Sequence, residues 1–561
     1  MFDAIVVGSG MSGGMSAKEL CERGLKVLVI ERGRKLVHGE SYTDMVQPWD
    51  APNAGMVPEE DMARHYMVQR NSFGSSLTQK FWVKDDEHPY TFPEDKPFYW
   101  IRGYHLGGRS IMWGRQSYRL SPQDFEANAK DGHGSDWPIR YDDLAPWYSH
   151  VEKFIGVAGS KEGLPQLPDG EFLPAFELND GEQMFKTAVE KAFPGRKVIP
   201  GRTANLSKAQ PHHEELGRSS CQARSFCDRG CTYGAYHSSL SSSLPAAERT
   251  GNLTIVTDAI VHSLVHNPKT GKVSGVRVID SNTKLGKTYE AKIVFLNAST
   301  IGTAQILLNS KSEAMPRGLA NSSDMVGRNL MDHMFALSVA GIFPNGPKDS
   351  YYHGRRPTGL YIPRFRNVTE SADFLRGYGY QGSVSRMSWR NMALSQPGIG
   401  AELKERTRKL GPWFSYISGF GEVLPNPENR VTLNENKRDQ WGIPLVDVNA
   451  SLGENEHKMA KQIIADGKAM ITAAGGMVVS AASEPAALGL GIHEMGTACM
   501  GKDPAKSVLN GFNQAHDVPN LFITDGAAMA SSGCQNPSLT YMALSARAAH
   551  HAVEFLKEGK L

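Results

Sequence analysis

The sequence predicts an α/β protein in which a doubly wound, mostly parallel sheet is combined with a smaller antiparallel-sheet α+β domain. Three observations lead to this class. A strand, a glycine-rich turn, a helix and a second strand follow one another in the first 31 residues. The 561 residues exceed the roughly 250 to 300 that one hydrophobic core accommodates. Residues 331–484 hold short alternating runs of apolar and polar side chains, which are typical of antiparallel strands.

The opening segment carries the strongest local signal. Ala4–Val7 and Lys26–Ile30 are predicted to be buried strands, and Met15–Arg23 between them is compatible with a helix. Glu31 lies 18 residues after Gly13, close to the spacing of an acid that binds a ribose 2′-hydroxyl. The turn contains Gly8, Gly10, Gly13 and Gly14. This pattern predicts a Rossmann-like dinucleotide site, although it does not decide between FAD and NAD.

Charge and hydropathy exclude other classes of partner. The 61 Lys and Arg residues and 59 Asp and Glu residues give a formal net charge of +2, so no nucleic-acid partner is expected. No apolar run reaches the roughly 18 to 20 residues that a membrane helix needs, so no direct membrane insertion is expected. The N-terminus MFDAIVVGSG leads straight into a strand, and no signal peptide of its own is expected.

Several longer segments carry a family resemblance. They read IRGYHLGGRSIMWGRQSYR at 101–119, GIHEMGTACMG from Gly491, and ITDGAAMASSGCQNPSLTYMALSARAA from Ile523. With the opening turn, they resemble the glucose–methanol–choline (GMC) oxidoreductases, a family of FAD enzymes. Segments 294–308, 325–333 and 424–433 are similar to family segments in the same order. Within the family, the chain most resembles bacterial glucoside 3-dehydrogenase and FAD glucose dehydrogenase catalytic subunits.

The resemblance implies further contacts to FAD. A glycine loop around Ser110 can lie flat against the isoalloxazine ring, although such a loop can also be an ordinary turn. Pyranose 2-oxidases of the family bind the flavin covalently through a histidine where this chain has Met112, so non-covalent FAD is expected. The expected contacts beyond the first turn are Gly107, Gly108, Ser110, Met112, Asp525, Gly526 and Pro537.

FAD contacts at both ends of the chain imply a discontinuous FAD-binding domain formed by residues 1–160, 200–330 and 485–561. Residues 331–484 would form the substrate-binding domain. Its expected strands include Phe335–Ile342, Gly359–Ile362 and Trp413–Ile417, and a helix is expected at Glu454–Ala474. The aromatic residues of this region suit either a sugar ring or the core. They are Tyr351, Tyr352, Tyr361, Trp389 and Trp413.

Two residues are the expected catalytic pair. Oxidation of an alcohol by hydride transfer needs a base that takes the hydroxyl proton, and His493 stands in the H-x-x-G-T context to which the resemblance assigns this role. A lone histidine outside such a motif is more often structural. Asn536 occupies a position at which family members carry histidine or asparagine. Its amide cannot act as a base at neutral pH, but it can orient the substrate oxygen.

Three of the six cysteines lie within eleven positions, at Cys221, Cys227 and Cys231. Their spacing is not C-x-x-C, which argues against zinc, and a disulfide would leave one cysteine over. Unligated buried cysteines are a further alternative. The spacing resembles that of bacterial dehydrogenases that carry an iron–sulfur cluster. Three thiolates would satisfy a three-iron cluster, whereas a four-iron cluster needs another ligand, for which His237 is the nearest downstream candidate and His212 and His213 lie upstream.

Taken together, these features predict an FAD dehydrogenase that oxidises a ring hydroxyl of a sugar or glycoside, with C3 as the expected position. Electrons would leave through the cluster to a cytochrome c. A sugar oxidase, or another alcohol dehydrogenase with structural cysteines and direct flavin reoxidation, is the alternative. The resemblance further implies a small accessory subunit. The chain would be periplasmic if it is exported with that subunit, and cytoplasmic otherwise.

Overall fold

The computed structural model describes residues 2–348, 357–387, 392–393, 398–408 and 411–561. Its first sheet has the strand order β4-β2-β1-β7-β6-β5, with β15 also paired to β7. Strands β1, β2, β4, β7 and β15 pair in parallel, whereas β6 is antiparallel to both β5 and β7. The strands are β1 (Phe2–Val7), β2 (Val27–Ile30), β4 (Leu253–Val256), β5 (Ala259–Asn267), β6 (Lys272–Asp280), β7 (Gly286–Leu296) and β15 (Leu521–Phe522).

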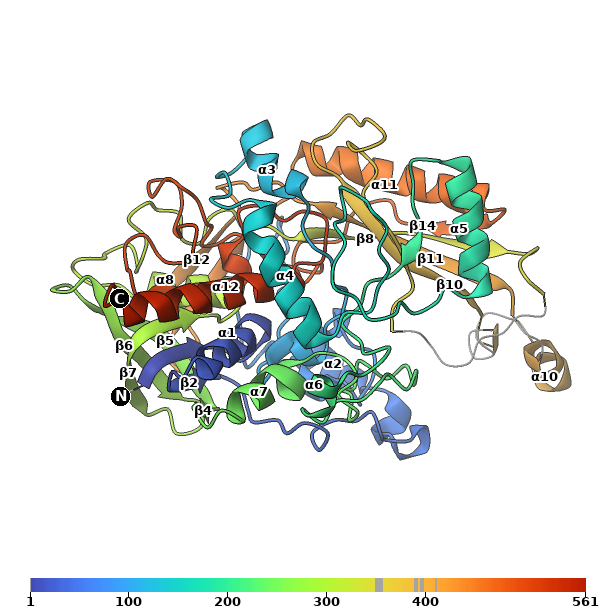
Figure 1. The fold of residues 1–561 in the computed structure, drawn as a ribbon. Coiled ribbons are helices and arrows are strands. Elements are labelled where there is room, and N and C mark those ends of the chain that lie inside the picture. The colour runs from blue at the N-terminus through green and yellow to red at the C-terminus, as the bar shows by residue number, and fades with distance from the viewer. Residues whose placement is uncertain (1, 349–356, 388–391, 394–397, 409–410) are drawn as a thin grey trace.

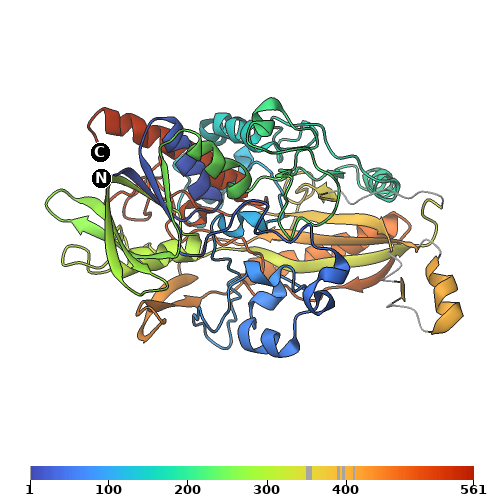
Figure 2. The same ribbon diagram turned by 90° about the horizontal axis from the view of Figure 1, so that it is seen from below.

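The second sheet is antiparallel, with the order β14-β8-β11-β10-β9-β3. Figure 2 shows it extending away from the first sheet, and the chain termini lie close together beside the first sheet. Its strands are β3 (Ile199–Pro200), β8 (His333–Phe343), β9 (Leu360–Ile362), β10 (Tyr378–Arg386), β11 (Trp413–Glu422) and β14 (Met477–Ala481). A separate two-stranded sheet contains β12 (Arg430–Arg438) and β13 (Pro444–Asn449).

Helices cover both sheets. Helices α1 and α12 pack on β1, β2 and β7 through a buried apolar cluster that includes Ala17, Leu20 and Ala549, and α4 packs against α12 (Figure 1). Helices α5 and α11 cover the antiparallel sheet. The α-helices discussed are α1 (Met11–Glu22), α3 (Pro122–Asp131), α4 (Tyr141–Ile155), α5 (Asp180–Ala192), α8 (Thr300–Asn309), α11 (Glu454–Ala473) and α12 (Ser538–Lys557).

The observed elements confirm the predicted fold class. Strands stand where the apolar runs predicted them, and α11 matches the predicted helix to within one residue. Helix α1 begins at Met11, four residues before the predicted start, because Gly13 and Gly14 form part of the helix rather than of the turn. Within the described ranges, no helix is both long and apolar enough to cross a membrane.

Candidate functional site

A cavity opens where the first sheet, the glycine turn and the antiparallel sheet meet. Its lining includes Glu31 and Ala259–His262 from the first sheet, the turn Gly8–Ser12, and the pair His493 and Asn536. It therefore brings together most of the predicted site residues from distant parts of the sequence. Those that line it are Gly8, Gly10, Glu31, Gly108, Ser110, Met112, His493, Asp525, Gly526, Asn536 and Pro537.

The glycine turn has the backbone geometry of a dinucleotide site. Gly8 has a φ of +90°, and a Cβ at Gly13 would lie 1.9 Å from the Gly8 carbonyl oxygen. Only glycine lets α1 start this close to the end of β1. The first N–H groups of α1 have no partner within the helix, and such groups bind phosphate. Gly13 lies behind the cavity wall with Gly14, whose Cβ would lie 2.6 Å from Ser239 Oγ.

Glu31 is buried at the end of β2 and is held by three hydrogen bonds. Its carboxylate accepts from the Ser9 N–H at 3.1 Å, the Ser9 hydroxyl at 2.6 Å and the Gly33 N–H at 2.9 Å. Ser9 Oγ in turn accepts from the Gly107 N–H at 2.9 Å. Burial raises the pKa of Glu31, while the Ser9 and Gly33 bonds lower it. A carboxylate accepts about four hydrogen bonds, so one site stays free for a ribose hydroxyl and the residues fit FAD.

The two other predicted FAD segments face the same cavity. Ser110 donates to the Gly107 carbonyl at 2.5 Å and accepts from the Ser239 N–H at 3.0 Å, which fixes the 107–112 loop. Asp525 accepts from the Thr303 hydroxyl at 2.6 Å and from the Ala527 N–H at 3.0 Å. Burial raises the pKa of Asp525 to about 6.

The predicted catalytic pair comes together. Nε2 of His493 lies 3.4 Å from Nδ2 of Asn536, and both residues line the cavity. The Asn536 carbonyl oxygen accepts a hydrogen bond from the side-chain amide of Gln381 on β10. Burial lowers the pKa of His493 well below its ordinary value, and His333 and Arg109 lower it further. His493 is therefore neutral at neutral pH and able to accept a proton.

His333 is a neighbour of the pair that the sequence did not single out. Its Nδ1 lies 2.8 Å from Nδ1 of His493. Beside it, the Asp332 carboxylate accepts hydrogen bonds from the N–H groups of Gly489, Gly491 and His493 at 2.8 to 3.0 Å, and so holds the loop that carries His493. The only sequence signal was the Asp-His pair that ends segment 325–333.

A second missed feature is the ion pair between Arg109 and Glu494. The Arg109 guanidinium donates to both Glu494 oxygens, at 2.8 and 3.3 Å, and also to Ser299 Oγ at 3.1 Å. The Glu494 side chain is 1% exposed. The pair ties the 107–112 loop to the residue that follows His493. Arg109 lies in a quoted motif, but nothing in the sequence identified its partner.

The three clustered cysteines lie away from this cavity, on a partly exposed loop. Burial raises the pKa of both Cys221 and Cys231. The negative charge of a Cys227 thiolate would raise both pKa values further. The loop is anchored on Asp44, which accepts from the Thr232 N–H at 3.0 Å and from Arg224. All three thiols are free. They are close enough to interact electrostatically.

His237 is placed differently from the thiols. It is fully buried, its ring contacts Trp113 and Phe154, and its Nδ1 lies 2.6 Å from Ser242 Oγ. Among the residues with described positions, no group of three or more His, Cys, Asp or Glu side chains has the arrangement that a metal ion needs. The structure thus brings the thiols near one another without assembling a metal site.

The aromatic residues considered for sugar stacking divide into two groups. Tyr361 and Trp413 are each 1% exposed and belong to the core, where Tyr361 stacks on Tyr118 at 4.0 Å. Tyr351, Tyr352 and Trp389 lie outside the described residues. Among the aromatic residues that line the cavity are Phe420, whose ring lies 6.2 Å from that of His493, and Phe335, whose ring lies 5.8 Å from that of Phe420.

Known proteins resemble the chain along nearly its whole length. It is 28% identical to the fructose dehydrogenase large subunit of Gluconobacter japonicus over 99% of this chain and 98% of that protein. It is 29% identical to 2-methyl-1,2-propanediol dehydrogenase of Mycolicibacterium austroafricanum over 97% of this chain and 94% of that protein. It is 26% identical to paromamine 6'-oxidase of Streptomyces fradiae over 98% and 90%.

A solved structure and models of protein families match the chain as well. The crystal structure of pyridoxine 4-oxidase from Mesorbium loti matches with a TM-score of 0.60 and 16% identity, covering 98% of this chain and 99% of that one. Residues 6–55 match an NAD(P)-binding Rossmann-like domain. Residues 204–335 and 425–545 match the two GMC oxidoreductase domains. The chain therefore belongs to the GMC oxidoreductase family and is an FAD-dependent enzyme that oxidises CH–OH groups.

Proposed function

We propose that the chain oxidises a ring hydroxyl of a sugar or glycoside at C3 and yields a 3-keto product, with His493 as the base. One observation carries this proposal: the Nε2 of a neutral histidine and the amide of Asn536 lie 3.4 Å apart in the cavity that holds the dinucleotide turn. When bound, FAD supplies the acceptor for the hydride that leaves the substrate carbon.

The protein side chains would divide the remaining work. Nε2 of His493 accepts the hydroxyl proton while the C–H electron pair leaves as hydride and the C–O bond becomes a carbonyl. Asn536 donates through Nδ2 to the substrate oxygen and so fixes its position. Because Gln381 holds the Asn536 carbonyl oxygen, the NH₂ group is turned toward His493 and the reacting oxygen.

The cavity wall supports a carbohydrate as the substrate. The amides of Gln116 and Gln381 line it and can pair with hydroxyl groups, while Phe335 and Phe420 offer apolar faces to the C–H side of a ring. Two of the relatives are named for fructose and for paromamine, which agrees with this class. The position of oxidation rests on the resemblance to glucoside 3-dehydrogenases.

We also propose an iron–sulfur cluster on Cys221, Cys227 and Cys231, with a cytochrome c as the electron acceptor. The cluster would be a three-iron type, or a four-iron type with a non-cysteine ligand. Three thiols on one partly exposed loop support this, and metal binding commonly completes the folding of such loops. Because the structure does not assemble the ligands, no electron-transfer step is assigned to them.

The accessory subunit and the location belong to the same proposal. The first relative is named as a large subunit, which supports a small partner subunit for this chain as well. Export together with that partner would place the enzyme in the periplasm. Co-expression with neighbouring genes, followed by cell fractionation, tests this, and activity confined to the cytoplasm in their presence would count against it.

A sugar oxidase is the second candidate. It is supported by the relative named paromamine 6'-oxidase. In that case the three cysteines are structural, and the reduced flavin is reoxidised directly by oxygen or a quinone.

One experiment tests both candidates. Purified, FAD-loaded protein is mixed anaerobically with methyl α-D-glucopyranoside, flavin bleaching is recorded, and the product is identified by NMR. Iron and acid-labile sulfide are measured on the same sample. A 3-keto product with iron and sulfide in the protein supports the dehydrogenase. The same product without iron, with hydrogen peroxide formed when oxygen is admitted, supports the oxidase. No bleaching by this glycoside or by a panel of free sugars contradicts the proposed substrate class.

A further inference from the structure

Two residues at the end of the antiparallel sheet, His333 and Glu422, form a clamp that holds the loop of Asn536 through hydrogen bonds to Gly533. His333 is the first residue of β8 and Glu422 the last residue of β11, and the two are direct partners across the sheet. Between them lies Gly533, whose N–H donates to Glu422 at 3.1 Å and whose carbonyl accepts from His333 Nε2 at 2.8 Å. Gly533 precedes Asn536 by three residues, so this clamp holds the loop of one catalytic residue and contacts the other through His333.

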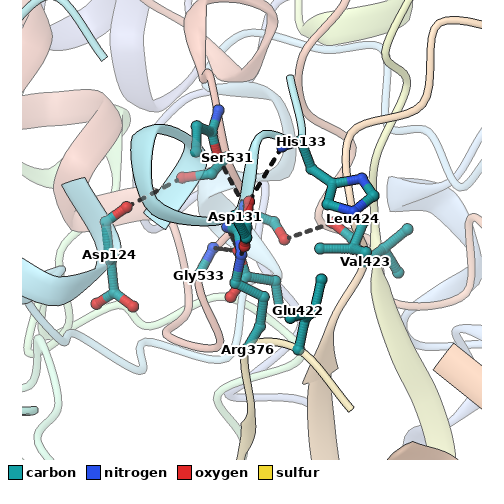
Figure 3. Close-up of polar contacts among 12 residues, drawn as sticks. Asp124, Asp131, His133, Arg376, Glu422, Val423, Leu424, Ser531 and Gly533 are labelled. Atoms are coloured by element: carbon teal, nitrogen blue, oxygen red, sulfur yellow. Dashed lines mark hydrogen bonds and ion pairs between the residues drawn. The ribbon is translucent and has the colours of Figure 1, made fainter. Parts of the chain in front are cut away.

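The clamp rests on a buried ion pair. Arg376 donates to Glu422 at 2.8 Å and pairs with Asp131 at the end of α3. Both Arg376 and Glu422 are at most 5% exposed. Figure 3 shows Asp131, Arg376, Glu422 and Gly533 gathered around this ion pair. Separating the two partners would leave a buried charge uncompensated. The ion pair therefore holds Glu422 in the position from which it accepts the Gly533 N–H.

The hydrogen bonds decide where the imidazole protons lie. A carbonyl oxygen only accepts, so His333 must carry its proton on Nε2 to bond Gly533. Burial lowers the pKa of His333 to about 4, so the ring is neutral and its Nδ1 is a bare acceptor. The 2.8 Å contact between the two Nδ1 atoms then requires the proton to be on His493. Nε2 of His493 is left unprotonated and faces Asn536.

We propose that His333 is a positioning residue, which holds the proton of His493 on Nδ1 through the Gly533 carbonyl and thereby leaves Nε2 free to act as the base. This inference rests on the proposed role of His493. A catalytic histidine in the wrong tautomer can lose up to about 10⁴-fold in rate. An apolar residue at position 333 would remove the acceptor for the Nδ1 proton of His493 and leave the 3.4 Å contact from Asn536 Nδ2 to favour this tautomer.

Two variants separate this role from simple packing. His333→Leu removes the acceptor, whereas the amide of His333→Gln can accept from His493 and donate to Gly533. With methyl α-D-glucopyranoside as the probe, we expect the limiting rate of anaerobic flavin reduction to fall about 10-fold to 1,000-fold in His333→Leu, with little change in the half-saturating concentration. His333→Gln should recover most of the loss. Equal rates in wild type and His333→Leu, or equal loss in both variants, would overturn the inference.

A spectroscopic measurement reads the tautomer in the unaltered holoenzyme, and variants serve only to assign the signals. Long-range ¹⁵N–¹H correlation spectra of histidine-labelled protein report which ring nitrogen carries the proton. The signals of His493 and of His333 are identified by their loss in His493→Ala and in His333→Gln. The expected form has the proton on Nδ1 of His493 and on Nε2 of His333, and the opposite form on His493 refutes the inference. If instead His493→Ala reduces its flavin at the wild-type rate, the proposed base is wrong.

Discussion

Replacement of Ser9 by alanine removes Oγ, the one atom that joins three parts of the dinucleotide site by hydrogen bonds. Ser9 Oγ donates to Glu31 at 2.6 Å and accepts from the Gly107 N–H at 2.9 Å, so it joins the β2 acid, the glycine turn and the 107–112 loop. Ser9→Ala removes a bond to a charged group, about 1.5 to 3 kcal/mol, and leaves a buried N–H unpaired, about 1 to 3 kcal/mol. We expect a total loss of about 2.5 to 6 kcal/mol of unfolding free energy.

The loss should depend on pH. The Ser9 bonds lower the pKa of the buried Glu31, so Ser9→Ala raises that pKa further above its unfolded value. Glu31 then keeps its proton to a higher pH in the folded state than in the unfolded state. The free energy of unfolding therefore falls as the pH rises above the pKa that Glu31 has in the unfolded chain. The difference between Ser9→Ala and wild type should therefore be larger at pH 8 than at pH 5.

Urea unfolding at both pH values, together with the dissociation constant of FAD, measures these effects. Ser274→Ala is the matched control, because Ser274 is exposed and only its weak 3.3 Å bond to the Val265 carbonyl is lost. Weaker FAD binding and lower stability are expected in Ser9→Ala only. If Ser9→Ala behaves like Ser274→Ala at both pH values, Ser9 does not join the three parts of the site.

Three further outcomes are expected. Burial lowers the pKa of His493, and His333 and Arg109 lower it further, so His493 stays neutral down to acid pH. The rate of flavin reduction, measured by stopped flow, should therefore be constant from pH 8 to 6.5 and fall only at more acid pH. Arg109→Leu leaves the buried Glu494 carboxylate without its ion-pair partner and should lower the free energy of unfolding by about 3 to 5 kcal/mol, measured by urea unfolding. The control Lys311→Leu removes an exposed pair with Glu435 and should not lower it. Cys227→Ser should lose iron while its FAD-loaded form is still reduced by substrate; normal iron content would contradict the cluster.

Local patterns predicted much of the fold and part of the site. The apolar run of β1 and the glycines after it depend on neighbouring residues only, so their sequence is informative. The start of α1 was misplaced because a glycine inside a helix has the same sequence signature as a glycine in a turn. The close approach of Gly13 to the Gly8 carbonyl, which explains it, is visible only in three dimensions.

The support around the catalytic pair could not be predicted, since it arises from strand register. His333 lies 160 positions from His493, and Gln381 lies 155 from Asn536. The pairings of β8 and β10 with β11 place His333 and Gln381 in one sheet, where they contact the loops that carry His493 and Asn536. The register of these strands depends on the whole sheet. Likewise, the spacing of three cysteines shows that they share a loop but does not fix the directions of their thiols.

Anaerobic stopped-flow reduction of the flavin in wild type and His493→Ala, with methyl α-D-glucopyranoside, tests the central claim most directly. FAD content is matched between the two proteins before mixing. Loss of a positioned general base should slow reduction about 100-fold to 10,000-fold while FAD remains bound. A reduction rate in FAD-loaded His493→Ala equal to that of wild type would contradict the account.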